Sequence, residues 1–362
     1  MGYYPLTKGK YRKLQTMAAT FFTMTSVIYL ALGCIFAAQN VSDVRLFSAT
    51  CAFLLTDLAL IVKMLNLLYH RKNIFLIEDM LKNPLFNEID AEEEIVLRQS
   101  LKMSKIIKII SATILITNIL FETVYPLVYK KFFLLMWFPF NPDDYFYKVC
   151  GFETLIAFTG ASFDVAVDVL TVLYMDLCAV QFVLLKHRLV QLGSTYTGDE
   201  VMDDRLRVEK LKKYVNHNDY TYRLCNVVEE TLSIGVFVQI LCSSAIICFS
   251  LFQLLLTPVK SIEFGLLIGY TIDMLWQLGT YCILGQKVLD SSDTITEACY
   301  MSKWYSCSLE FKKNLLVIMN RTNKPVILLA GGVFPLNLNT MMNILSTTYS
   351  FFTLIWNMYN EN

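Results

Sequence analysis

Long apolar runs alternate with charged stretches along the chain. Seven of these runs are close to the length that a helix needs to cross a bilayer, about 20 residues. They lie at residues 17–39, 46–69, 109–131, 155–185, 234–257, 262–286 and 335–356. The pattern predicts an all-α polytopic membrane protein with seven transmembrane helices.

The charged stretches between the runs also carry helical patterns. In 186–233 one helical face is charged and the other is apolar, and the apolar positions are Val208, Leu211 and Val215. This apolar face requires a partner, and we expect either a helix at 302–323 or another subunit. Pro325 then separates that helix from the last run. If residues 313–330 cross the membrane instead, the count of spans becomes eight.

The distribution of Lys and Arg predicts the orientation, because loops that stay in the cytosol retain basic residues. Of the 31 Lys and Arg residues, 25 fall in alternate loops, at residues 8–13, 71–108, 186–223 and 287–324. With these loops inside, the amino terminus is cytosolic, and seven spans place the carboxyl terminus outside. The sequon at Asn40 then lies in an outer loop and predicts a glycosylation site, whereas the one at Asn320 stays inside.

Composition agrees with a membrane location and argues against several functions. Hydrophobic residues make up 55% of the chain and charged ones 17%, against about 25% in soluble domains. A formal net charge of zero argues against nucleic acid as a partner. The sequence has no C-x-x-C pair, no metal-ligand spacing of His, and no HExxH, P-loop or GxSxG motif. We therefore expect no metal, no cofactor and no enzyme activity.

Several ionisable residues lie inside the predicted spans, where such groups normally face the bundle interior and pair. They are Asp57, Lys63, Glu122, Asp164, Asp168, Asp176 and Asp273. Counted down from the outer ends of spans two and four at about 1.5 Å per residue, Lys63 and Asp176 share a depth. We therefore expect a structural ion pair between these two residues. An ion pathway through span four, as in a transporter, is an alternative, but no internal repeat supports it.

The last run is apolar enough for a bilayer yet contains many neutral polar residues. At helical spacing they fall on one stripe, which consists of Asn339, Asn343, Ser346 or Thr347, Ser350, Leu354 and Asn357. A polar stripe in hydrocarbon is costly unless it meets another helix or water. Two interpretations remain open: a hydrogen-bonded interface between helices, or the wall of a pore that four copies form around an axis.

Seven spans also suggest a G-protein-coupled receptor, but the predicted orientation is the reverse of that class. The sequence NPDDY at 141–145 matches the NPxxY motif of those receptors. Here it lies in an outer loop after span three, whereas the motif belongs at the inner end of span seven. The match is therefore accidental.

From residue 270 onward the chain resembles the insect odorant receptor family. The similar segments are YTIDMLWQLGTYCILGQKV (270–288), ACYMSKWYS (298–306) and KPVILLAGGVFPLNLNTMMNILSTTYSFFTLI (324–355). Several family motifs thus occur in order and at the right spacing, although Pro335, Asn337 and Phe351 depart from the pattern. The short loop between spans four and five resembles that of the variable, ligand-binding subunits rather than that of the co-receptor.

The resemblance implies an odorant-gated, non-selective cation channel in the plasma membrane of sensory neurons. It implies a heterotetramer with the odorant co-receptor, in which the last span lines the pore, Leu354 forms the constriction and the Asn357 amide lies nearby. The implied partners are the co-receptor, the lipid bilayer, permeating cations and a small volatile hydrophobic ligand. A gustatory-type chemoreceptor channel is the closest alternative.

The resemblance also implies a ligand pocket in the outer half of the subunit, between spans two, three, four and six. The candidates by depth and helical spacing are Thr50, Phe53, Leu54, Asn118, Phe121, Tyr125, Phe158, Ser162, Ala166, Leu267 and Tyr270. We expect an apolar pocket with few polar groups. The aromatic outer loop at 133–140, with Trp137 and Phe138, is expected to cap its entry.

The predicted organisation has three parts. Residues 1–286 form a six-helix ligand-binding bundle with cytosolic loops at 71–108 and 186–233. Residues 287–334 form a cytosolic anchor helix that contributes subunit contacts. Residues 335–362 form the pore-lining seventh helix and a short extracellular tail.

Overall fold

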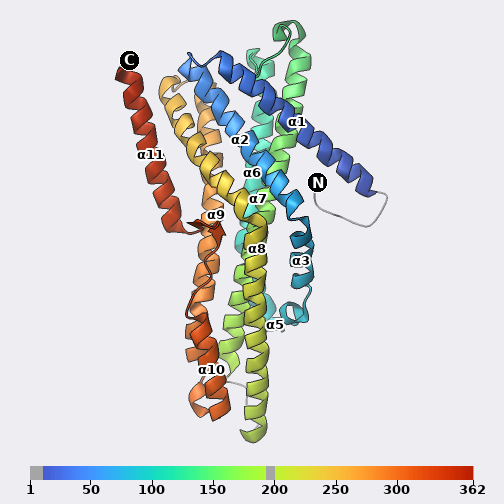
Figure 1. Cartoon of the computed structure of the whole chain (residues 1–362), viewed down its shortest axis with the longest axis vertical. Coiled ribbons are helices and arrows are strands. Elements are labelled where there is room, and N and C mark those ends of the chain that lie inside the picture. Colours follow the sequence, from blue (N-terminus) through green and yellow to red (C-terminus); the bar gives the residue numbers. More distant parts are fainter. Residues whose placement is uncertain (1–10, 193–199, 362) are drawn as a thin grey trace.

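The computed structural model describes residues 11–192 and 200–361, and most of this part of the chain is helical. Long helices form the body of the molecule (Figure 1). They are α1 (Tyr11–Gln39), α2 (Val44–Tyr69), α6 (Lys102–Tyr129), α7 (Phe146–Gln191), α8 (Glu200–Leu256), α9 (Ile262–Tyr300) and α11 (Leu338–Glu361). Each predicted span overlaps one of them, so the all-α fold class is confirmed.

Short elements connect the long helices. They are α3 (Arg71–Leu81), α4 (Pro84–Asn87), α5 (Ala91–Ser100), η1 (Pro142–Tyr145), η3 (Trp304–Ser306), α10 (Leu309–Thr322), β1 (Leu329–Ala330) and β2 (Phe334–Pro335). The two strands pair antiparallel, with Leu329 opposite Pro335 and Ala330 opposite Phe334.

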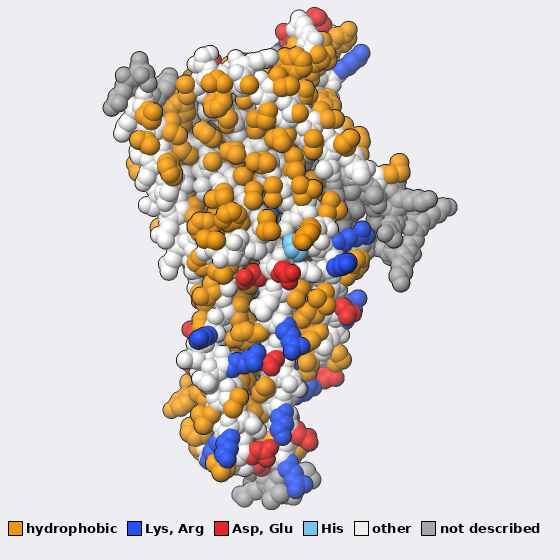
Figure 2. Space-filling model, viewed as in Figure 1, with side chains coloured by type: hydrophobic (Ala, Val, Ile, Leu, Met, Phe, Trp, Pro, Cys, Tyr) orange, Lys and Arg blue, Asp and Glu red, His pale blue; other side chains and the backbone are white. Residues whose placement is uncertain are grey.

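Three of the long helices exceed the thickness of a bilayer. Helices α7, α8 and α9 have 46, 57 and 39 residues. At about 1.5 Å per residue, α8 is nearly three times as long as a hydrocarbon core of about 30 Å is thick. On the face shown in Figure 2, hydrophobic side chains fill the upper part and charged side chains gather in the lower part. We call these parts the apolar half and the charged half.

Among the described residues, five helical stretches are long and apolar enough to cross a membrane. They are Thr20–Gln39, Val44–Tyr69, Ala91–Tyr129, Pro142–Gln191 and Asp204–Leu256. The predicted spans at 262–286 and 335–356 lie on α9 and α11, which are not among the five. Both remain predictions, as does the orientation of the chain in the membrane.

The charged half contains the expected partner for the apolar face of α8. Val208 and Leu211 are buried in the main core cluster together with Phe311 and Leu315 of α10. Charged contacts at the edge add to this packing, since Lys212 Nζ lies 3.2 Å from Glu310 Oε1. The prediction of a second helix within 302–323 is therefore confirmed, because α10 covers this face within the same chain.

Two glycines allow the β-hairpin to pack tightly between α8 and α9. Gly331 has a φ of +62°, and a Cβ there would lie 2.7 Å from the Phe237 ring of α8. Its N–H donates to the Ser233 carbonyl at 3.1 Å. On the other side, a Cβ on Gly285 of α9 would lie only 2.2 Å from the Leu336 carbonyl oxygen. The chain can therefore reach the start of α11 only because both positions lack a side chain.

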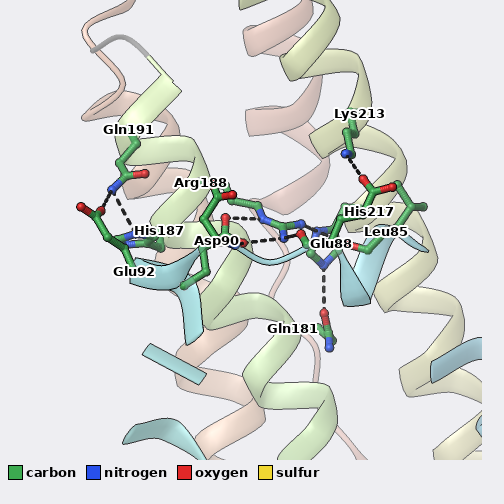
Figure 3. A network of polar contacts seen from close by, with 11 residues as sticks. Leu85, Glu88, Asp90, Glu92, Gln181, His187, Arg188, Gln191, Lys213 and His217 are labelled. Carbon is green, nitrogen blue, oxygen red and sulfur yellow. Dashed lines mark hydrogen bonds and ion pairs between the residues drawn. The ribbon is translucent and has the colours of Figure 1, made fainter. Parts of the chain in front are cut away.

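A buried arginine holds the α4–α5 segment against α7 and α8 (Figure 3). Arg188 donates to both carboxylate oxygens of Glu93, each at 2.8 Å, and to the carbonyls of Leu85 at 3.1 Å and Glu88 at 2.7 Å. Its remaining bond, at 3.1 Å, goes to His217 Nδ1. All five guanidinium N–H donors can thus be satisfied, which is what a buried charge requires.

The same contact fixes the protonation state of His217. Because Arg188 can only donate, His217 Nδ1 must accept, and His217 Nε2–H then donates to Gln181 Oε1 at 3.2 Å. Burial and the Arg188 charge lower the pKa of His217 to about 3. Nearby, a hydrogen bond of 2.6 Å from Lys213 lowers the pKa of Glu88. His217 is therefore a neutral structural residue at physiological pH.

We predict that Gly285→Ala disrupts the packing of the hairpin on α9. The new methyl group would overlap the Leu336 backbone, which cannot rotate away, and overpacking of this kind costs about 1–3 kcal/mol or more. Surface expression and the thermal unfolding midpoint of the purified protein should both fall. Gly279→Ala is the control, because its Cβ would lie 3.7 Å from the Met341 Cε, an ordinary contact. Equal stability of the two variants would contradict the prediction.

Candidate ligand cavity and pore helix

A cavity of about 130 Å³ lies among α1, α2, α6, α7 and α9. Aromatic rings form one wall: the Phe53 ring centroid lies 5.5 Å from that of Tyr270 and 5.5 Å from that of Phe133. The Tyr270 hydroxyl is hydrogen-bonded to Thr56 Oγ1 and so faces α2. A cavity of about this size can hold a molecule with one aromatic ring.

A second cavity, of about 490 Å³, adjoins the first. The two share the side chains of Phe53, Asn118, Glu122, Phe133 and Tyr270, so these five residues separate one space from the other. The second cavity reaches residues at the ends of helices, including Asp43, Lys131 and Glu263. It therefore forms a vestibule to the inner cavity.

A charged network adjoins the inner cavity, which two of its members, Asp164 and Gln277, line. Lys63 Nζ of α2 lies 2.8 Å from Asp164 Oδ1 and 2.6 Å from Asp168 Oδ1, both on α7. From α9, Gln277 donates to Asp164 at 2.8 Å and Tyr281 donates to Asp168 at 2.5 Å. The Lys63 ammonium group and the two carboxylates that it contacts thus join α2, α7 and α9 in the apolar half of the molecule.

The expected ion pair between Lys63 and Asp176 is wrong. Asp176 instead lies 2.5 Å from Lys287 Nζ and accepts a hydrogen bond from Ser104. The error arose at the outer end of span four, because α7 begins at Phe146 rather than near 155. Lys63 is 19 residues from the start of α2 and Asp164 is 18 residues from the start of α7, so depth counting from the true ends selects Asp164.

The predicted ligand-binding residues divide into three groups. Phe53, Asn118 and Tyr270 line the inner cavity. Phe121, Tyr125 and Leu267 line the vestibule. The remaining candidates line neither space; they are Thr50, Leu54, Trp137, Phe138, Phe158, Ser162 and Ala166. The candidates on α6 and α9 thus line one of the two spaces, whereas those on α7 lie on a different face of that helix. Ligand binding by any of them stays a prediction.

The α7 face and the outer loop meet the cavity through other residues. From α7 these are Ile156, Ala157, Gly160, Ala161, Asp164 and Val165. In the loop, Phe133 and Leu134 line the cavity. The backbone N–H of Trp137 donates to the Leu32 carbonyl at 3.2 Å and so fixes the loop to α1. Asp164 was the sequence signal that could have identified this α7 face, because a charged residue within a span normally faces the bundle interior.

A model of the 7tm odorant receptor family matches residues 43–349, which is most of the chain. The chain belongs to the odorant receptor family. Five helical stretches within residues 11–192 and 200–361 are long and apolar enough to cross a membrane, so this odorant receptor is a multi-pass membrane protein.

Relatives in a fly share part of the sequence. Odorant receptor 85b of Drosophila melanogaster is 27% identical over 238 residues, which cover 64% of this chain and 58% of the relative. Odorant receptor 67c of the same species is 24% identical over 237 residues, which cover 64% of this chain and 57% of the relative. The matched part therefore spans less than two thirds of the length of these relatives.

Solved structures share the fold across nearly the whole chain. The insect olfactory receptor OR5 from Machilis hrabei in complex with eugenol superimposes with a TM-score of 0.86 at 14% identity, covering 99% of this chain and 94% of that one. A second structure of the same receptor gives a TM-score of 0.80 at 14% identity, covering 97% of this chain and 92% of that one. At this identity the likeness establishes the fold.

In this odorant receptor, α11 lies at the edge of the protomer (Figure 1). The predicted stripe is exposed along its length, at Asn339, Asn343, Ser346, Thr347, Ser350, Leu354 and Asn357. The opposite face is turned inward, with Met341, Ile344 and Leu345 packed on the core. Two hydroxyls of the stripe bond within the helix, from Thr347 to the Asn343 carbonyl and from Ser350 to the Ser346 carbonyl. Most of the polar surface of α11 therefore points away from its own protomer.

Asn40, the predicted glycosylation site, lies in the turn between α1 and α2. Its side-chain amide donates to the Phe36 carbonyl at 2.8 Å. The site thus follows directly after the first candidate span, and its modification stays a prediction.

We predict that Lys63→Met strongly destabilises the receptor, because Asp164 and Asp168 would lose their buried counter-charge. Breaking such a network costs about 3–5 kcal/mol. The unfolding midpoint in detergent micelles and the surface expression should fall. Adding Asp164→Asn and Asp168→Asn to this variant should recover most of the loss, since neutral amides need no counter-charge. If Lys63→Met alone were as stable as the wild type, the ion pairs of Lys63 with Asp164 and Asp168 would contribute nothing to stability.

Proposed function

We propose that this receptor is a ligand-binding subunit of an odorant-gated, non-selective cation channel. It works as a heterotetramer with the odorant co-receptor, in the plasma membrane of sensory neurons. Residues 335–362 supply the pore helix, 287–334 the cytosolic subunit contacts, and 1–286 the ligand-binding bundle. The observation that carries the proposal is the outward-facing polar stripe of α11 on a protein of this family.

The stripe supports conduction for a physical reason. Neutral amide and hydroxyl groups exposed to lipid would be costly, so the stripe requires water or other helices. Four copies of α11 around an axis would satisfy it and enclose an aqueous path. Neutral oxygens can replace part of the hydration shell of a small cation, and without a ring of charges they discriminate weakly among cations. Leu354 is apolar and 55% exposed on this stripe, as a gate that closes by dewetting requires.

The inner cavity supports a small volatile ligand. Its volume of about 130 Å³ and its aromatic wall suit a molecule of one ring with a short substituent. The eugenol bound to the olfactory receptor OR5 of Machilis hrabei is a ligand of this class in a structure of the same fold.

Currents in cells that express this chain test the proposal directly. We expect an odorant panel to open a cation conductance when the chain is expressed with the co-receptor, and to give none in cells with the co-receptor alone. Reversal potentials should change little when Na⁺ is exchanged for K⁺. The proposal requires that the response persists when G-protein signalling is blocked. Loss of the response under that block would favour a G-protein-coupled receptor instead.

We predict that Leu354→Ser raises the basal current several-fold, because a hydroxyl in place of the isobutyl group would keep the constriction wet. Met342→Ser is the matched control: Met342 is also exposed on α11, at 66%, but lies off the polar stripe. The readout is holding current without odorant, normalised to surface expression. An unchanged basal current in Leu354→Ser, or an equal rise in Met342→Ser, would rule out Leu354 as the gate.

A further inference from the structure

Four helices each contribute one carboxylate to the inner cavity. They are Asp57 of α2, Glu122 of α6, Asp164 of α7 and Asp273 of α9. The residues that line the cavity include no Lys, Arg or His. For a space in the apolar half of a membrane protein, this excess of acidic groups requires a physical explanation.

The nearest ammonium group is already in use. Lys63 is shared between Asp164 and Asp168. Asp164 also accepts a hydrogen bond from Gln277, and Asp168 accepts one from Tyr281. No ion pair among the described residues involves Asp57, Glu122 or Asp273. The three carboxyl groups therefore face the cavity without a basic partner from the described part of the chain.

Asp57 and Glu122 also have vacant hydrogen-bonding capacity. Asp57 is only 8% exposed, and its Oδ2 atom accepts no hydrogen bond within the described structure. Oε2 of Glu122 is buried and equally without a donor. Asp273 has a weak one, the Asn118 amide at 3.4 Å. Buried polar atoms are normally satisfied, so vacant acceptors at the wall of a cavity indicate a donor that enters it.

We propose that the ligand of this cavity is a small organic cation, a protonated amine. Its ammonium N–H groups donate to Asp57, with Glu122 and Asp273 completing the negative site. Its apolar part packs on Phe53, Phe133 and Tyr270, whose ring faces also attract a cation. This inference rests on the proposed function for the cavity as the odorant site, and it narrows the odorant to a chemical class.

Pairs of ligands that share a carbon skeleton and carry either an ammonium or a hydroxyl group test the proposal. The pairs are 2-phenylethylamine with 2-phenylethanol and hexylamine with hexanol. Dissociation constants are measured by calorimetry on the full chain in lipid nanodiscs at pH 7. We expect each amine to bind at least about tenfold more tightly than its alcohol, as hydrogen bonds to charged groups allow.

Variants then locate the site. Asp57→Asn and Glu122→Gln should each reduce the preference for the amine severalfold while alcohol binding stays the same or improves. Both variants remove a buried charge and are expected to fold. Asp143→Asn is the control, because Asp143 is an exposed carboxylate of η1 outside the cavity. A preference for the amine that survives both cavity variants would overturn the proposal.

Other outcomes are equally decisive. Equal or tighter binding of the alcohols, or no amine binding at millimolar concentration, would mean that the carboxyl groups are protonated and that the site takes neutral ligands. If Na⁺ alone stabilises the wild type against heat but not Asp57→Asn, the occupant is an inorganic cation, and the amine proposal fails.

Currents separate this inference from the proposed function. If neutral odorants open the channel and amines neither bind nor activate, the amine proposal alone fails; if amines bind but no odorant drives a current, the channel proposal fails.

Discussion

The ammonium group of Lys63 ties α2 to α7 in the apolar half of the molecule, and much of the structure depends on its being neutralised there. A charge in hydrocarbon has no water to turn to, so its partners must come from the protein. Asp164 and Asp168, one helical turn apart on α7, supply them. Their second partners, Gln277 and Tyr281, bring in α9, and Gln277 in turn accepts from Gln239 of α8 at 2.7 Å. A single buried charge thus fixes the relative rotation of four helices and forms the floor of the cavity above.

The same constraint explains the arrangement of α11. Its apolar face packs on α8 and α9, and the outward face carries amides and hydroxyls that hydrocarbon cannot satisfy. Lys63 found its partners within the protomer, but the α11 stripe has few there beyond its own helix. The described part of the chain therefore satisfies its buried charge internally but leaves the polar face of its last helix without partners from other helices, as the proposed pore requires.

The sequence was sufficient for the features that periodicity and charge control. The apolar runs identified the long helices. The apolar face of α8 indicated a partner, either a helix at 302–323 or another subunit, and α10 is that partner. Motif residues such as Gly285 and Gly331 fall at close contacts, with the Leu336 backbone and the Phe237 ring, but no pattern in the sequence shows what they touch. The Lys63 partner was missed because α7 begins nine residues earlier than the apolar run, at polar and aromatic residues that hydropathy does not count as a span.

The cavity shows a second limit of periodicity. On α7 nearly every face is apolar, so depth alone cannot choose between Phe158, which is 51% exposed, and Ile156, which is 6% exposed. Charged residues resolve such cases, because each must face the protein interior. Asp57, Glu122, Asp164 and Asp273 all line the cavity, whereas the aromatic candidates divided between cavity, vestibule and surface. In a membrane bundle, the few ionisable residues mark helix faces more reliably than the many apolar ones.

Helix α9 connects the two functional regions by direct contact. Asp273 and Gln277 lie at the cavity, and Gly285, two to three turns further along, lies against the Leu336 backbone just before α11. The side chain of Gln286 also accepts from the Leu338 N–H at 3.4 Å, at the first residue of α11. Because Gly285 leaves no space between α9 and this backbone, a shift or rotation of α9 must displace the start of α11 as well. Under the proposed function, a ligand that rearranges the polar groups of α9 in the cavity would therefore act on the same helix that positions α11.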